Sequence, residues 1–228
     1  MTTYALIHGG CHGGWCWEQL VPELQARGHE SVAPDLPIED VNAGAREWAD
    51  VVVDALDGVD DDVVVVGHSM GGMAVPVVAA RRPVRRMVFL GAMVPVPGRV
   101  YAEYLAENPD AVTMPVDRNA TDELGRSVVP WDNALAAFYH DCPEPLARAA
   151  WERLRPQAPT VFTERCPIDE WPDVPSSYIL MTEDRSVGNE WSRRVSRERL
   201  HTEAIELPGS HSPFMSRPGV LADVLVAL

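Results

Sequence analysis

The stretch Gly67-His68-Ser69-Met70-Gly71 constrains the fold more than any other part of the chain. It follows the apolar run 63–66 and precedes a segment with a helical pattern. This G-x-S-x-G order is typical of a nucleophile elbow, a sharp strand-to-helix turn at the top of a parallel sheet. A turn that tight pushes the serine toward unfavourable backbone angles and leaves no room for a Cβ two residues to either side. The pattern therefore predicts a parallel sheet with Ser69 as a nucleophile at its edge.

Apolar runs and amphipathic segments alternate on both sides of this turn, as in a sheet covered by helices on both faces. We expect a mostly parallel, doubly wound α/β sheet of about six strands with right-handed crossovers. The expected strands are 4–7, 31–33, 63–66, 86–92, 178–181 and 202–207, and the expected helices are 15–27, 45–56, 70–82 with a kink at Pro76, 189–199 and 220–228.

The middle of the chain, residues 94–175, breaks this alternation because prolines are frequent and no apolar strand run appears. A solvated linker is one interpretation, but such a segment would not carry so many large aromatic side chains. We therefore predict a core formed by residues 1–93 and 176–228 and a small helical cap insertion formed by 94–175. Short helices are expected at 100–107, 131–139 and 145–154. Four aromatic side chains of this segment are candidates to line a pocket: Trp131, Phe138, Tyr139 and Trp151.

The charge of the chain limits its partners. A net charge of −15 and a pI near 4.8 argue against binding to nucleic acid or to an anionic membrane surface.

No apolar run approaches the ~20 residues that span a bilayer, and no export signal is visible at the start, so we expect a cytoplasmic protein. A homodimer is possible. The four scattered cysteines are expected to be reduced thiols.

A metal site is one interpretation of the cluster His8, Cys11, His12 and Cys16, because imidazole and thiolate are the preferred ligands of zinc. Their spacing matches none of the usual zinc patterns, and the glycines between them indicate a loop. We expect neither a metal nor an organic cofactor.

A serine nucleophile needs a base, and in an open parallel sheet that base comes from a loop at the carboxyl end of a strand. Of the seven histidines, His8, His68 and His211 meet this condition. His68 adjoins Ser69 on a tight turn, where neighbouring side chains point apart, and His8 belongs to a glycine-rich loop. The base is therefore predicted to be His211.

The base in turn needs an acidic partner that fixes its tautomer. Asp184 follows an expected strand and precedes His211, which gives the chain order serine, acid, histidine. Glu183 is the rival, although a shift of one residue points a side chain the other way. The developing negative charge of an acyl-transfer reaction also needs donors. We expect them to be the backbone N–H groups of Met70 and Gly10.

Taken together, the segments 8–17 (HGGCHGGWCW), 67–72 (GHSMGG), 182–184 (TED) and 209–211 (GSH) resemble the α/β-hydrolase superfamily. Within it they are most similar to the branch that holds the plant methylesterases and the hydroxynitrile lyases. The resemblance implies an α/β-hydrolase fold, Ser69 as nucleophile, His211 as base with Asp184 as its partner, and the Gly10 and Met70 amides as the oxyanion hole.

The chain departs from the lyases of this branch at two positions. The lyases that are similar to this chain carry a threonine at the position of Gly9. They also carry a lysine directly after the catalytic histidine, at the position of Ser212. Both departures favour ester hydrolysis. We expect the substrate to be a small ester that is neutral or apolar. The alternatives are a lyase or cofactor-free oxygenase on the same scaffold, a hydrolase of lactones or thioesters, and a protein that binds small molecules without turnover.

Overall fold

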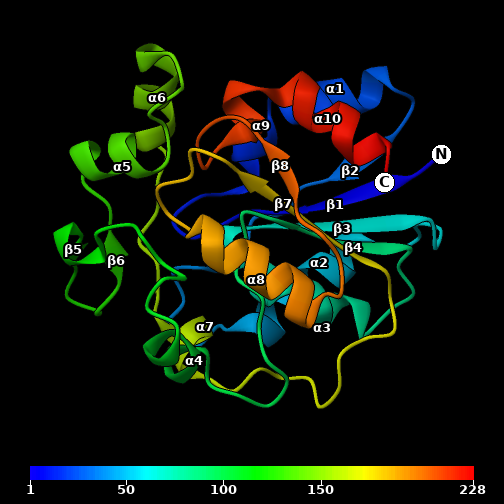
Figure 1. Cartoon of the computed structure of the whole chain (residues 1–228), viewed down its shortest axis with the longest axis horizontal. Coiled ribbons are helices and arrows are strands. Elements are labelled where there is room, and N and C mark those ends of the chain that lie inside the picture. Colours follow the sequence, from blue (N-terminus) through cyan, green and yellow to red (C-terminus); the bar gives the residue numbers. More distant parts are fainter.

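The computed structural model describes all 228 residues and contains a six-stranded parallel sheet in the order β2-β1-β3-β4-β7-β8 (Figure 1). Every pairing between neighbouring strands of this sheet is parallel, which confirms the predicted fold class. The strands are β1 (Thr3–Ile7), β2 (Glu30–Val32), β3 (Val63–His68), β4 (Arg86–Leu90), β7 (Ser176–Met181) and β8 (Ile205–Leu207).

The central strands are apolar on both sides because helices cover both faces of the sheet. In β3, Val63 and Val65 join one buried cluster, whereas Val64 and Val66 join the other, as the period of two in a strand requires. The first face packs against α2 (Ala45–Ala55), α3 (Val75–Ala79) and α8 (Asn189–Arg199). The second packs against the 3-10 turn η1 (Gly14–Trp17), α1 (Leu20–Ala26), α9 (Pro213–Ser216) and α10 (Pro218–Val226).

Two predicted helices are divided in the structure. The segment 15–27 forms η1 and then α1, and the segment 70–82 forms the 3-10 turn η2 (Ser69–Met73) and then α3. Proline explains both divisions, because it cannot donate a backbone hydrogen bond and is tolerated only in the first turn of a helix. Pro22 and Pro76 both lie in the first turn of their helices, so the expected kink at Pro76 is a helix start instead.

The last strand is shorter than the predicted 202–207, and α9 was not predicted. Residues 201–204 do not pair with the sheet, because they are bonded to the end of α8. The Thr202 N–H donates to the Ser196 carbonyl, and the Ser196 hydroxyl donates to the Thr202 carbonyl over 2.7 Å. The strand therefore begins only at Ile205.

The helices and the hairpin of residues 94–175 lie at the carboxyl edge of the sheet, and the end of this segment returns to the amino edge, where β7 begins (Figure 1). The three predicted helices are present as α4 (Tyr101–Glu107), α5 (Trp131–Ala137) and α6 (Glu144–Trp151). The segment also holds η3 (Val116–Arg118), α7 (Thr160–Thr163) and a hairpin of β5 (Ala120–Thr121) and β6 (Ser127–Val128). Its side chains join both core clusters, for example Tyr101 on one face and Tyr139 on the other. The division into core and cap stays a prediction.

No helix of the structure combines the length and the apolar character needed to cross a membrane.

Candidate active site

Ser69 lies at the turn between β3 and η2 with a φ of +51°, a value that side-chain-bearing residues rarely adopt. The flanking glycines allow this turn. A Cβ on Gly71 would lie 2.5 Å from the His8 carbonyl oxygen, and one on Gly67 would collide with Val75. The predicted steric reason for both glycines is therefore confirmed, and the strained serine is held at the carboxyl edge of the sheet.

Asp184 and His211 meet at the same edge, where the loops after β7 and β8 converge. Asp184 Oδ2 lies 2.8 Å from His211 Nδ1, and both side chains are almost fully buried. The other carboxylate oxygen of Asp184 accepts the N–H groups of Ser186 and Val187, which fix its orientation. Glu183 is exposed and its side chain forms no such contact. The structure thus brings Asp184, and not Glu183, to the histidine.

The carboxylate determines which nitrogen of His211 carries a proton. Nδ1 donates to Asp184, so the neutral ring keeps a lone pair on Nε2, and Nε2 forms no hydrogen bond in the structure. Ser69 and His211 both line one cavity, and the Ser69 hydroxyl is free of hydrogen bonds. A free imidazole nitrogen and a free hydroxyl at one cavity are the groups that base-assisted nucleophilic attack requires.

His68 supports His211. Its Nε2 donates to the His211 carbonyl oxygen over 2.9 Å, and the two rings lie 4.4 Å apart between centroids. Burial holds the pKa of His68 well below its ordinary value, so the ring stays neutral. This agrees with the expectation that His68 is a packing residue rather than the base.

The segment after α5 holds the His211 loop from the other side. The backbone N–H and the hydroxyl of Ser210 both donate to the Asp141 carboxylate, and the hydroxyl also approaches the Phe138 carbonyl oxygen. Burial raises the pKa of Asp141, but the Ser210 hydrogen bonds outweigh it and hold the pKa below its ordinary value. The ionised carboxylate therefore anchors the loop directly before His211.

The loop after β1 presents one free N–H group to the cavity. His8 Nδ1 donates to the Gly9 carbonyl over 2.8 Å, which turns the Gly10 N–H of the same peptide to the opposite side. The next peptide is held at both ends, since its carbonyl accepts from His12 Nδ1 and its N–H, that of Cys11, donates to Gln157 Oε1. Neither the Gly10 N–H nor the Met70 N–H donates to a protein acceptor. Both residues line the cavity, so the geometry has room for an oxyanion there.

The ring nitrogens of His8 and His12 are fully occupied, which leaves no lone pair for a metal. His8 Nε2 accepts the Leu36 N–H, and His12 Nε2 accepts the Tyr139 hydroxyl over 2.7 Å. Burial lowers the pKa of His8 to about 3 and that of His12 to about 4, so both are neutral. The structure holds no group of three or more His, Cys, Asp or Glu arranged to bind a metal ion.

The sequence reasoning missed His12 and Gln157 as parts of the site. His12 lies beyond the end of its strand, and Gln157 follows an irregular part of the middle segment. For His12 a signal existed in the H-G-x-x-H spacing of residues 8–12, whereas nothing local distinguishes Gln157 from a surface glutamine.

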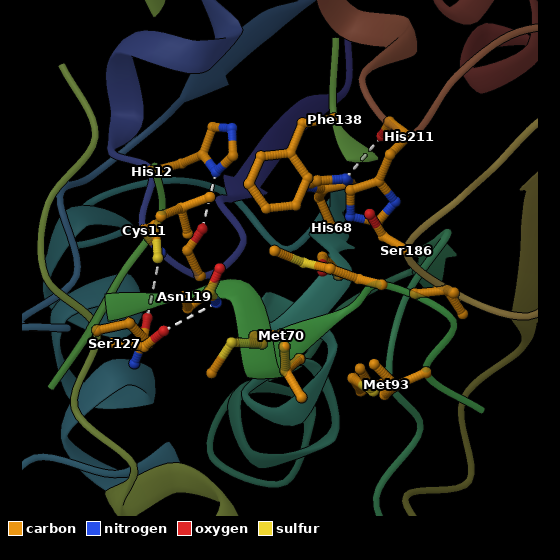
Figure 2. Close-up of a pocket in the computed structure, with 18 of the residues that line it drawn as sticks. Cys11, His12, His68, Met70, Met93, Asn119, Ser127, Phe138, Ser186 and His211 are labelled. Atoms are coloured by element: carbon orange, nitrogen blue, oxygen red, sulfur yellow. Dashed lines mark hydrogen bonds between the residues drawn. The ribbon is translucent and has the colours of Figure 1, made fainter. Parts of the chain in front are cut away.

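The cavity next to Ser69 has a volume of about 410 Å³ and is mostly apolar (Figure 2). No Asp, Glu, Lys or Arg lines it. Of the aromatic candidates, Phe138 lines the cavity, whereas Trp131, Tyr139 and Trp151 do not. Trp131 packs against Trp151 under the Arg148 guanidinium, 3.7 Å from the Trp131 ring centroid. One aromatic lining residue, Phe162, was not among the candidates.

Position 9 adjoins the nucleophile. A Cβ on Gly9 would lie 2.9 Å from Ser69 Cβ and 2.8 Å from His68 Nδ1. A larger side chain at position 9 would therefore displace the elbow itself.

Ser212, the residue after His211, is fully buried but does not line the cavity, and its hydroxyl has no hydrogen-bond partner.

Comparison with known proteins gives a consistent result. Residues 5–224 match the model of the alpha/beta hydrolase family. The chain is 26% identical over 252 residues to Methylesterase 9 of Arabidopsis thaliana, covering 100% of this chain and 98% of that protein. It is 28% identical over 256 residues to Salicylic acid-binding protein 2 of Nicotiana tabacum, covering 99% and 96%. The crystal structure of polyneuridine aldehyde esterase, 21% identical, has the same fold with a TM-score of 0.82 over 100% of this chain and 98% of that chain.

Proposed function

The chain belongs to the α/β-hydrolase family, and from this premise we propose that it is a serine esterase that cleaves small neutral carboxylic esters through an acyl-enzyme on Ser69. Full-length curated relatives carry methylesterase names, which supports an esterase-type hydrolase. The observation that carries the serine mechanism is the 2.8 Å contact between Asp184 and His211, together with a strained, unpaired Ser69 that lines the same cavity as His211.

In the proposed reaction, His211 Nε2 takes the proton from the Ser69 hydroxyl as Ser69 Oγ attacks the ester carbonyl carbon. The resulting oxyanion accepts hydrogen bonds from the Gly10 and Met70 N–H groups, each worth about 10²–10³ in rate. His211 then gives its proton to the departing alcohol oxygen, which leaves the acyl group on Ser69. A water molecule, deprotonated by His211, attacks the acyl-enzyme and releases the acid.

The small residues at the two positions that differ from the lyases support hydrolysis. A Cβ at position 9 would lie 2.9 Å from Ser69 Cβ and 2.8 Å from His68 Nδ1, so a threonine does not fit without displacing them. Ser212 carries no charge and its side chain does not line the cavity, so it supplies no cation for a cyanide leaving group. No specific observation favours the lyase, oxygenase or non-catalytic alternatives.

The cavity supports a neutral substrate. Its walls carry no charged side chain, and the removal of a charge from water into an apolar site costs far more free energy than the removal of a neutral ester. The surrounding protein, with a net charge of −15, further disfavours the approach of anions.

The test compares the wild type with Ser69→Ala on short p-nitrophenyl and methyl esters. The wild type is expected to hydrolyse both and to be labelled at Ser69 by a fluorophosphonate. Ser69→Ala should lose the label and at least about 10³-fold in kcat. Thr121→Ala, which removes an exposed hydroxyl elsewhere, serves as the control.

Retained hydrolysis by Ser69→Ala at an unchanged melting temperature would refute the nucleophile. Cyanide release from cyanohydrins without any ester cleavage would favour the lyase alternative instead.

A further inference from the structure

Apart from Ser69 and its neighbouring histidines, the cavity lining holds one pair of polar side chains with unused hydrogen-bond donors. Asn119, which directly precedes β5, and Ser127, which lies on β6, both line the cavity. Asn119 Nδ2 donates one hydrogen to Ser127 Oγ over 3.0 Å, which leaves its second N–H free. The Ser127 hydroxyl accepts this bond and has no acceptor of its own in the protein. The pair therefore presents two unused donors to the cavity.

The other side-chain hydrogen-bond donors of the lining are already engaged. The Ser186 hydroxyl donates to the Ala137 carbonyl, and both hydrogens of Gln157 Nε2 have backbone acceptors. His12 uses both ring nitrogens. Outside Ser69 and His211, Asn119 and Ser127 thus hold the only side-chain N–H or O–H donors of the lining that remain free.

The pair is held in place from behind. Asn133, which is buried on α5, donates from Nδ2 to Asn119 Oδ1 over 2.7 Å. The backbone of Ser127 exchanges two hydrogen bonds with that of Gln157, the residue whose side chain binds the Cys11 N–H. A continuous series of hydrogen bonds therefore links the polar pair to the loop that carries the Gly10 N–H.

The pair lies away from the proposed base. In Figure 2, Asn119 and Ser127 are on the same side of the cavity as Cys11, whereas His211 and Ser186 are on the opposite side. Apolar side chains, among them Met70 and Phe138, line the cavity between them. A molecule that reaches both ends needs an apolar middle.

We propose that Asn119 and Ser127 form a specificity subsite for a hydrogen-bond acceptor at the far end of the substrate. The preferred substrate is then a neutral ester with an apolar body and a distal carbonyl, ether or hydroxyl oxygen. This inference rests on the proposed esterase function. A wholly apolar ester would displace water from the two donors without replacing its hydrogen bonds, and such a loss lowers the affinity for the transition state.

The experiment uses pairs of methyl esters of similar shape that differ only at the distal end: methyl ω-(4-acetylphenyl)alkanoates against methyl ω-(4-isopropylphenyl)alkanoates. The linker between ring and ester is lengthened one methylene at a time to find the length that spans the cavity. At that length, the wild type is expected to favour the acetyl ester about tenfold in kcat/KM.

Three variants assign the preference. The double variant Asn119→Leu/Ser127→Ala removes both donors and should bring the ratio close to one, while Ser127→Thr, which keeps the hydroxyl, should retain it. Thr121→Ala is the matched control, because Thr121 pairs with Ser127 in the hairpin but is exposed and does not line the cavity. Turnover of the isopropyl ester reports whether each variant is folded.

The outcomes separate the two proposals. If the wild type hydrolysed neither series, the esterase function and the subsite would both be refuted. If it hydrolysed both series with equal kcat/KM at every linker length, or if the double variant kept the wild-type ratio, the subsite alone would be refuted. The comparison of the two esters on the wild type needs no variant to fold.

Discussion

Three buried histidines around the site make the stability of this protein fall as the pH falls. His8, His12 and His68 are fully desolvated, and burial lowers the pKa of His8 to about 3, that of His12 to about 4 and that of His68 well below 6.5. In the unfolded chain each returns to its ordinary value of 6.5. Between these values the unfolded chain binds more protons than the folded one, so acid favours unfolding.

The magnitude follows from the two pKa values of each ring. On going from about pH 7 to about pH 5.5, the unfolded form of one such histidine gains about 1.2 kcal/mol from protonation, while the folded form gains almost nothing. Three rings together lower the free energy of unfolding by about 4 kcal/mol. That is a large share of the roughly 5–15 kcal/mol by which a domain of this kind is stable.

The assay is urea unfolding at several pH values across that range, followed by tryptophan fluorescence. His12→Asn keeps a donor toward the Gly10 carbonyl but cannot be protonated, so its pH dependence should be smaller than that of the wild type by about one third. His201→Asn is the matched control, because His201 is exposed and its φ of +53° suits asparagine. A wild-type free energy of unfolding that does not change with pH, or equal slopes for the two variants, would refute the reasoning.

The remaining predictions concern activity. Asp184→Asn should lower kcat about 10⁴-fold in an ester assay, whereas Glu183→Gln should stay within about twofold; the reverse result would exchange their roles. Gly9→Thr should lower ester kcat/KM more than about tenfold without producing cyanohydrin cleavage, since its Cβ would meet Ser69 and His68; wild-type activity would refute the steric argument. Asp141→Asn weakens the anchor before His211 and should lower both the melting temperature and kcat, with KM nearly unchanged; a change in KM alone would contradict a positioning role.

Features governed by a local period or a close approach could be predicted from the sequence. The run 63–66 predicts a strand because apolar side chains are needed on both faces. Gly67 and Gly71 are required because a Cβ would collide with the Val75 side chain at Gly67 and with backbone oxygens at Gly71. The pairing of Asp184 with His211 could be predicted for a topological reason, since the carboxyl ends of parallel strands share one edge.

The features that could not be predicted depend on the path of irregular segments. The strands β5 and β6 have two residues each, too few for any period to be visible, and α7 is a single turn. The turns of the chain after α4 and α6 bring Asn119 to Ser127 and Gln157 to Cys11. No pattern of neighbouring residues encodes those contacts.

The distribution of free and occupied donors connects these two groups of features. Polar groups that line an apolar cavity are usually paired, so a side-chain donor left free there marks a place for a ligand atom. In the loop after β1, the side chains of His8, His12 and Gln157 form hydrogen bonds with backbone groups of residues 9–11. The Gly10 and Met70 N–H groups stay free, where an ester carbonyl would develop negative charge. By the same reasoning, the free donors of Asn119 and Ser127 mark the other end of the substrate. The elbow motif determines where the bond is cleaved, and the middle segment determines which molecule extends across the cavity.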